Sequence, residues 1–128
     1  MSELQTLKKQ MTAVVARYKA AVAQAISLNV QALEAEEAVG VIKSERDDLR
    51  DLRKSFETSE GKAIAQKALS AFDTAIKAKI EAVRKLRIKT KQARTVADDA
   101  YESGERIYGR IQEYDDRYNF PSAFDEMY

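Results

Sequence analysis

The sequence predicts an all-α protein, a long antiparallel two-helix hairpin of the coiled-coil type, packed into a larger helical bundle or oligomer. Apolar residues recur every seven positions over most of the first 56 residues, and such a repeat is typical of a coiled-coil helix. A second long apolar repeat follows a short polar interruption. Pro occurs once and Gly four times, and 34% of the residues are charged, which is the composition of long helices.

The first helix is expected over residues 3–57. Ser2 and Gln5 have the spacing of a capping box, in which each side chain bonds the other residue's backbone N–H. Two interleaved apolar rows then follow in phase: Leu4, Met11, Tyr18, Ala25, Ala32 and Val39, and Leu7, Val14, Ala21, Leu28, Ala35, Ile42, Leu49 and Phe56. A seam of this kind must be covered by another helix.

A turn is expected at residues 58–61, where Thr58 or Ser59 can cap the next helix. Because this connection is short, the second helix, over 62–118, should run antiparallel to the first. Its apolar set is Ala65, Leu69, Phe72, Ile76, Val83, Leu86, Ala93, Ala97, Ala100, Ile107, Ile111, Tyr114 and Tyr118. Lys79 falls on this row, so the adjacent Ile80 is expected to be buried instead. Ser103-Gly104 is a candidate kink.

Charge supports the antiparallel arrangement. Residues 1–94 carry 19 basic and 12 acidic side chains, whereas residues 95–128 carry 3 basic and 9 acidic. With the turn near residue 59, opposite charges face each other along the two helices, and Tyr18 comes to lie near Tyr101. The order of such pairs selects the register, although each exposed pair contributes only about 0.2–1 kcal/mol.

A second apolar stripe lies beside the main seam of the first helix. It consists of Val15, Val22, Ile26, Val30 and Leu33. A helix with two apolar faces expects a further helical neighbour, so we predict that this stripe contacts another copy or another protein. The alternative is that these residues only widen the seam.

Residues 119–128 are expected to form a C-terminal anchoring tail. They carry four large apolar side chains, Phe120, Phe124, Met127 and Tyr128. Aromatic and Met side chains are frequent anchors of protein interfaces, which favours a docked tail. The alternative is a frayed terminus.

A basic run between residues 77 and 94 is the strongest indication of nucleic-acid binding. Its candidate contact residues are Lys77, Arg84, Arg87, Lys91 and Arg94. A stripe of this kind can follow a phosphate backbone. However, Glu34, Glu36 and Glu37 face this region in the expected register, so a paired or solvated face is the alternative, and nucleic acid is the less favoured partner.

No catalytic, cofactor-binding or metal site is predicted. The chain has no His and no Cys, which excludes the usual zinc ligands and the usual general base. Gly61-Lys62 lacks the upstream Gly of a phosphate loop, because Phe56 stands there. No apolar run approaches the length of about 18 residues that a membrane span needs. Met1-Ser2-Glu3-Leu4 has no signal-peptide pattern, so a cytoplasmic or virion-associated protein is expected.

These observations predict a non-enzymatic structural or adaptor subunit of a multi-protein assembly, such as a virion or another macromolecular machine. Its hairpin and aromatic tail would make the protein–protein contacts. Two alternatives remain open: a coiled coil that binds nucleic acid through the basic stripe, and a small helical inhibitor or chaperone that binds one partner protein.

Overall fold

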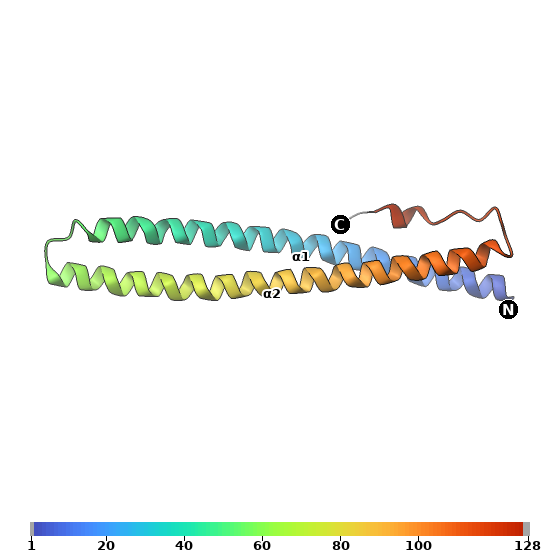
Figure 1. Ribbon diagram of the computed structural model, residues 1–128, viewed down its shortest axis with the longest axis horizontal. Helices are drawn as coiled ribbons and strands as arrows, with labels where there is room; N and C mark the ends of the chain where they lie inside the picture. The colour runs from blue at the N-terminus through green and yellow to red at the C-terminus, as the bar shows by residue number, and fades with distance from the viewer. Residues whose placement is uncertain (1, 127–128) are drawn as a thin grey trace. The chain divides into compact units, whose positions relative to one another are not determined.

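The computed structural model describes residues 2–126, so Met1, Met127 and Tyr128 lie outside the described part of the chain. Two long helices, α1 (Glu3–Arg53) and α2 (Ser59–Gln112), are followed by a short 3-10 helix, η1 (Ser122–Asp125) (Figure 1). No strand occurs among residues 2–126. Many contacts join α1 to α2, and these contacts confirm the predicted antiparallel hairpin.

The helix termini follow local hydrogen bonding. Ser2 and Gln5 form the predicted capping box, with both backbone-to-side-chain bonds at 3.2 Å. At the start of α2, the Thr58 hydroxyl accepts a bond of 3.0 Å from the Gly61 N–H, so Thr58 rather than Ser59 is the N-cap.

Both long helices end earlier than the sequence suggested. α1 ends at Arg53 instead of residue 57, because the backbone then tightens into i→i+3 bonds such as Phe56 N–H to the Arg53 carbonyl. α2 ends at Gln112 instead of residue 118. Beyond it, the Asp115 carboxylate accepts a bond from the Arg117 N–H, and this side-chain turn replaces helical bonding. α2 is continuous through Ser103 and Gly104, the expected site of a kink.

The chain divides into two compact units, each built from one stretch of α1 and one stretch of α2. Unit 1 comprises Met1–Asn29 and Ile88–Tyr128, and unit 2 comprises Val30–Arg87. The segment after α2 therefore belongs to unit 1, and it turns back along the helices there (Figure 1).

The core of unit 1 contains most of the large buried side chains. Both predicted rows of α1 contribute to it, and α2 contributes mainly small residues opposite them. The buried cluster consists of Leu7, Met11, Val14, Tyr18, Ala21, Val22, Ala97, Ala100, Ile111 and Phe124. Small residues on one helix let the two backbones approach closely, so the larger side chains of α1 fill the space between them. Thr90 is also buried in this unit, a position that the apolar pattern missed.

Unit 2 has fewer buried residues than unit 1. Those from the apolar rows are Ala32, Val39, Ala65, Leu69 and Ile76. The prediction that Ile80 is buried is wrong, since this side chain is 46% exposed. It borders an open groove shared with Val39, Gly40 and Val83. Even a Cβ added at Gly40 would meet nothing within 4 Å, so the groove is open at this point.

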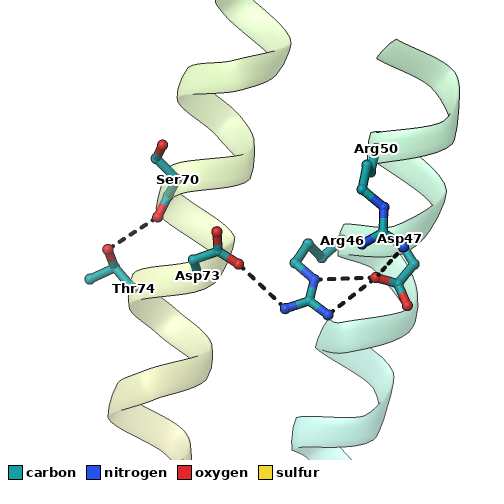
Figure 2. A network of polar contacts seen from close by, with 6 residues as sticks. All are labelled: Arg46, Asp47, Arg50, Ser70, Asp73 and Thr74. Carbon is teal, nitrogen blue, oxygen red and sulfur yellow. Dashed lines mark hydrogen bonds and ion pairs between the residues drawn. The ribbon is translucent and has the colours of Figure 1, made fainter. Parts of the chain in front are cut away.

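Polar contacts link α1 and α2 within unit 2 (Figure 2). The Arg46 guanidinium reaches across to the Asp73 carboxylate at 3.4 Å and also bonds Asp47 of its own helix at 3.2 Å. Arg50 adds a contact of 3.3 Å to the same Asp47 carboxylate. Near the turn, Arg53 donates to the side-chain oxygen of Gln66. These exposed contacts favour one register and contribute little to stability.

Candidate interaction surfaces

The C-terminal tail, here residues 119–126, packs against four residues of unit 1 that we call the aromatic groove: Tyr18 of α1 and Tyr101, Gly104 and Tyr108 of α2. The Phe124 ring lies 5.0 Å from the Tyr18 ring and 5.6 Å from the Tyr101 ring, measured between centroids. The Phe120 ring lies 5.7 Å from Tyr101 and 5.2 Å from Tyr108. All four contacts are edge-to-face or tilted, which are favourable arrangements of aromatic rings.

The tail presents its two phenylalanines together. Their rings stack with centroids 5.0 Å apart and an interplanar angle of 21°. Phe124 lies in the short 3-10 helix η1, four residues after Phe120 in the sequence. A hydrogen bond from the Phe124 N–H to the Pro121 carbonyl closes the first turn of η1. Phe124 is only 4% exposed, whereas Phe120 is half-buried.

Gly104 makes this packing possible. A Cβ built at Gly104 would lie 2.6 Å from Cζ and 2.9 Å from Cε2 of Phe124, which is well inside van der Waals contact. The Phe124 ring therefore rests directly on the backbone of α2. The glycine that the sequence suggested as a kink serves instead as the floor of the aromatic groove.

Tyr18 holds the tail by its backbone as well as by its ring. Its hydroxyl donates a bond of 2.5 Å to the Glu126 carbonyl, and the Phe124 carbonyl lies 3.5 Å from the same hydroxyl. Burial raises the pKa of the Tyr18 hydroxyl, and the negative charge of Glu126 adds to this effect. The neutral, hydrogen-bond-donating form is therefore favoured in the folded protein.

The tail residues predicted as partner anchors thus divide into three groups. Phe124, predicted as an interface residue of a docked tail, is buried against the chain's own helices, because Gly104 leaves room for its ring. Phe120 packs against the same groove and keeps part of its surface exposed. Met127 and Tyr128 lie outside the described residues. The expected proximity of Tyr18 and Tyr101 is confirmed, with ring centroids 6.3 Å apart.

The second apolar stripe of α1 is also divided. In unit 1, Val22 is 2% exposed and belongs to the buried cluster that contains Phe124, while Val15 packs against that cluster and is half-buried. The chain's own side chains cover these two residues. Ile26 of unit 1 is 46% exposed, and Val30 and Leu33 of unit 2 are 47% and 52% exposed.

The basic stripe is partly neutralised. In unit 2, two nitrogens of the Arg87 guanidinium bond one Glu36 carboxylate oxygen at 3.0 and 2.7 Å, and Arg84 bonds Glu81 of its own helix. Lys77 is exposed in unit 2, and Lys91 and Arg94 are exposed in unit 1. The expected pairing with the Glu34–Glu37 region is therefore present at Glu36.

Two features of unit 1 were missed by the sequence reasoning. One is the aromatic groove itself, since no local pattern marks Gly104 as the contact of a residue 20 positions away. The other is an exposed apolar pair on α2, Ile88 and Val96. Their spacing of eight residues is a helical spacing that could have identified them as sharing one face.

The described residues 2–126 contain no group of three or more His, Cys, Asp or Glu side chains arranged to hold a metal ion. A search of the same residues for a helix long and apolar enough to cross a membrane also finds none. No family model, no curated protein and no solved structure matches the chain. The chain's own surfaces are therefore the basis for inferring its function.

Proposed function

We propose that this chain is a non-enzymatic structural or adaptor subunit of a multi-protein assembly, such as a virion or another macromolecular machine. The observation that carries the proposal is the exposed part of the second apolar stripe. Val30 and Leu33 lie three residues apart on α1 in unit 2, so they share one face, and about half of each side chain is exposed. Exposed apolar patches on a helical surface are typical of protein–protein contacts.

Other exposed apolar residues support the same interpretation. Ile26 of unit 1 continues the spacing of the stripe on α1, and Ile88 and Val96 expose apolar surface on α2 of that unit. Full burial of one such side chain contributes about 1.5–3 kcal/mol, so residues that are already half-buried would each contribute roughly half of this. Because association has its own cost, a stable interface requires several of these residues together.

The test is the molar mass of the protein in solution, measured by light scattering over a concentration series. We expect a stable multiple of the 14.4 kDa chain. Leu33→Asn should shift the association to higher concentration by about tenfold or more, which corresponds to about 1.4 kcal/mol. The matched control is Leu52→Asn, which removes a similarly exposed leucine from α1 outside the stripe and should leave the association unchanged.

Circular dichroism of each variant checks that helicity is retained. If the wild-type chain stays monomeric at all concentrations, self-association through the stripe is refuted. If both leucine variants weaken association equally, general surface hydrophobicity and not the stripe is responsible. Either result would contradict assembly through the second apolar stripe.

A second candidate function is nucleic-acid binding through the basic stripe. In its favour, Lys77 in unit 2 is exposed together with the neighbouring Lys79 and Lys85, and Lys91 in unit 1 is exposed as well. The ion pairs of Arg84 and Arg87 count against it, because these cations already have carboxylate partners. This function predicts retention on DNA or RNA at low salt and a steep loss of affinity as salt rises. Absence of retention at low salt would exclude it.

A further inference from the structure

We propose that the aromatic groove is a recognition site for a Phe-x-x-x-Phe segment, and that a second copy of this chain supplies the segment by exchanging its C-terminal tail. This inference rests on the proposed function, because it names the partner through which the assembly would be joined. It concerns unit 1 alone and does not involve Val30 or Leu33.

The contacts that seat the tail are all local to a short segment. The segment contributes two rings, Phe120 and Phe124, and the backbone carbonyls of Phe124 and Glu126. The groove contributes three tyrosine rings and the bare backbone at Gly104. The same contacts would form with an identical tail from another chain, which is the condition for exchange of an element between protomers.

The segment that connects α2 to the tail is suited to such an exchange. Residues 113–119 form turns instead of a regular helix, and most of them are exposed. Seven residues can span roughly 25 Å when extended, which is enough to reach a neighbouring chain. An exchange must release two kinds of contact in this connection. At the surface, Lys8 lies 3.7 Å from Asp115. The half-buried Tyr118 packs against the core of unit 1, with its ring centroid 6.2 Å from that of Tyr108.

Local concentration decides between docking within one chain and docking between chains. A short linker holds the tail at an effective concentration of about the millimolar range, so an isolated chain keeps its own tail in the groove. Neighbouring subunits in an ordered assembly are at a similar local concentration. Exchange replaces each contact in the groove by an identical one, so its cost is confined to the contacts of residues 113–119, and each exchanged tail links two subunits.

The test uses two full-length variants that are each unable to dock their own tail. Gly104→Leu blocks the groove and leaves the tail intact, and Phe124→Ala disables the tail and leaves the groove intact. Both are made in a Val30→Asn/Leu33→Asn background, which removes both exposed stripe residues of unit 2, so that association through the stripe is suppressed. In an equimolar mixture, the tail of the first variant can occupy only the groove of the second.

We expect the mixture to approach about twice the mass of the single chain by light scattering near millimolar concentration, while each variant alone stays monomeric. The near-ultraviolet circular dichroism of the tyrosines should differ from the mean of the two separate spectra. The control is a mixture of Phe124→Ala with the double variant Gly104→Leu/Phe124→Ala, which has no intact tail and should not associate. If Gly104→Leu loses helicity, Gly104→Ala replaces it.

A mixture whose mass and spectrum equal the mean of its components would overturn tail exchange. This failure is distinct from failure of the proposed function. If wild-type chains associate in a Leu33-dependent manner and the variants do not combine, only the exchange is wrong. If the variants combine while wild-type chains show no Leu33-dependent association, the stripe is not the assembly surface and the exchange stands.

Discussion

Replacement of Gly104 by alanine should loosen the tail, although alanine normally stabilises a helix. In α2, Gly104 and Gly109 are both helical, and a glycine in such a position is less stable than alanine by about 0.5–1 kcal/mol. At Gly109 an added Cβ would meet nothing within 4 Å. At Gly104 it would lie 2.6 Å from Cζ of Phe124, whereas ordinary contacts begin at 3.4 Å.

The added Cβ would thus lie about 0.8 Å closer to the Phe124 ring than an ordinary contact allows, and this overlap sets the size of the effect on docking. The Phe124 ring must move away from the helix, and insertion of an extra carbon into a packed site costs about 1–3 kcal/mol. The gain in helix propensity is the same at both glycines, so it cancels in the comparison. Docking of the tail in Gly104→Ala should therefore be about 1–3 kcal/mol weaker than in Gly109→Ala.

Chymotrypsin cleavage after Phe124 measures this docking, because the enzyme must reach a residue that is 4% exposed in the docked tail. When opening and closing are fast, the cleavage rate follows the population of the open tail. Gly104→Ala should be cleaved about 5- to 150-fold faster than Gly109→Ala, since each 1.4 kcal/mol is a factor of ten. The intensity of the near-ultraviolet circular dichroism of the tyrosines should also be lower in Gly104→Ala.

A double-mutant cycle identifies the cause. In the Phe124→Ala background, Gly104→Ala has no ring to displace, so it should stabilise the protein by about 0.5–1 kcal/mol, like Gly109→Ala. The reasoning is refuted if Gly104→Ala, with Phe124 present, raises the thermal midpoint as Gly109→Ala does and leaves the cleavage rate unchanged.

Three further predictions concern the hydroxyl of Tyr18, the small residues of the seam and the ion pair of unit 2. Because folding raises the pKa of the Tyr18 hydroxyl, its hydrogen bond stabilises the docked tail fully below about pH 10, and this stabilisation is lost as pH rises through the higher pKa of the folded state. The rate of tail cleavage should therefore rise over this pH range. Tyr18→Phe should abolish the pH dependence and weaken docking by about 0.5–1.5 kcal/mol. Ala97→Leu overpacks a residue that has no exposed surface and should lower the free energy of unfolding in urea by about 1–3 kcal/mol, whereas the exposed Ala16→Leu should stay within about 0.5 kcal/mol of wild type. A double-mutant cycle of Arg46→Met and Asp73→Asn should give a coupling free energy below about 1 kcal/mol for this ion pair, and the value should decrease as salt is added. A larger coupling free energy that does not depend on salt would contradict the assignment of this pair as solvent-exposed.

The hairpin could be predicted from the sequence because its signals are local and repeated. A seven-residue spacing maps directly onto one face of a helix, and it marked both rows of α1 that the structure buries or half-buries. The capping box at Ser2 and Gln5 is likewise local, since both partners lie within one turn. The opposite charges of the two helices indicated a register close enough to bring Tyr18 near Tyr101.

Some local predictions failed where the partner helix decides the outcome. Ile80 is as apolar as the buried Ile76, yet it is exposed because it borders an open groove that the facing residues of α1 do not fill. Similarly, the end of α2 at Gln112 depends on turn hydrogen bonds that compete with continued helix, and the apolar pattern through Tyr118 does not report on that competition. Periodicity describes one helix, whereas burial depends on what faces it.

Only the tertiary structure revealed the position of the tail. The sequence indicated that Phe120 and Phe124 were anchors, and it left open what they contact. Phe124 contacts Tyr18, 106 residues away in the sequence, and Gly104, whose absent side chain is the essential feature. Phe120 contacts Tyr101 and Tyr108. Such a site depends on the space between elements that are distant along the chain. That space arises only after α1 and α2 have paired, so no spacing within a single segment encodes it.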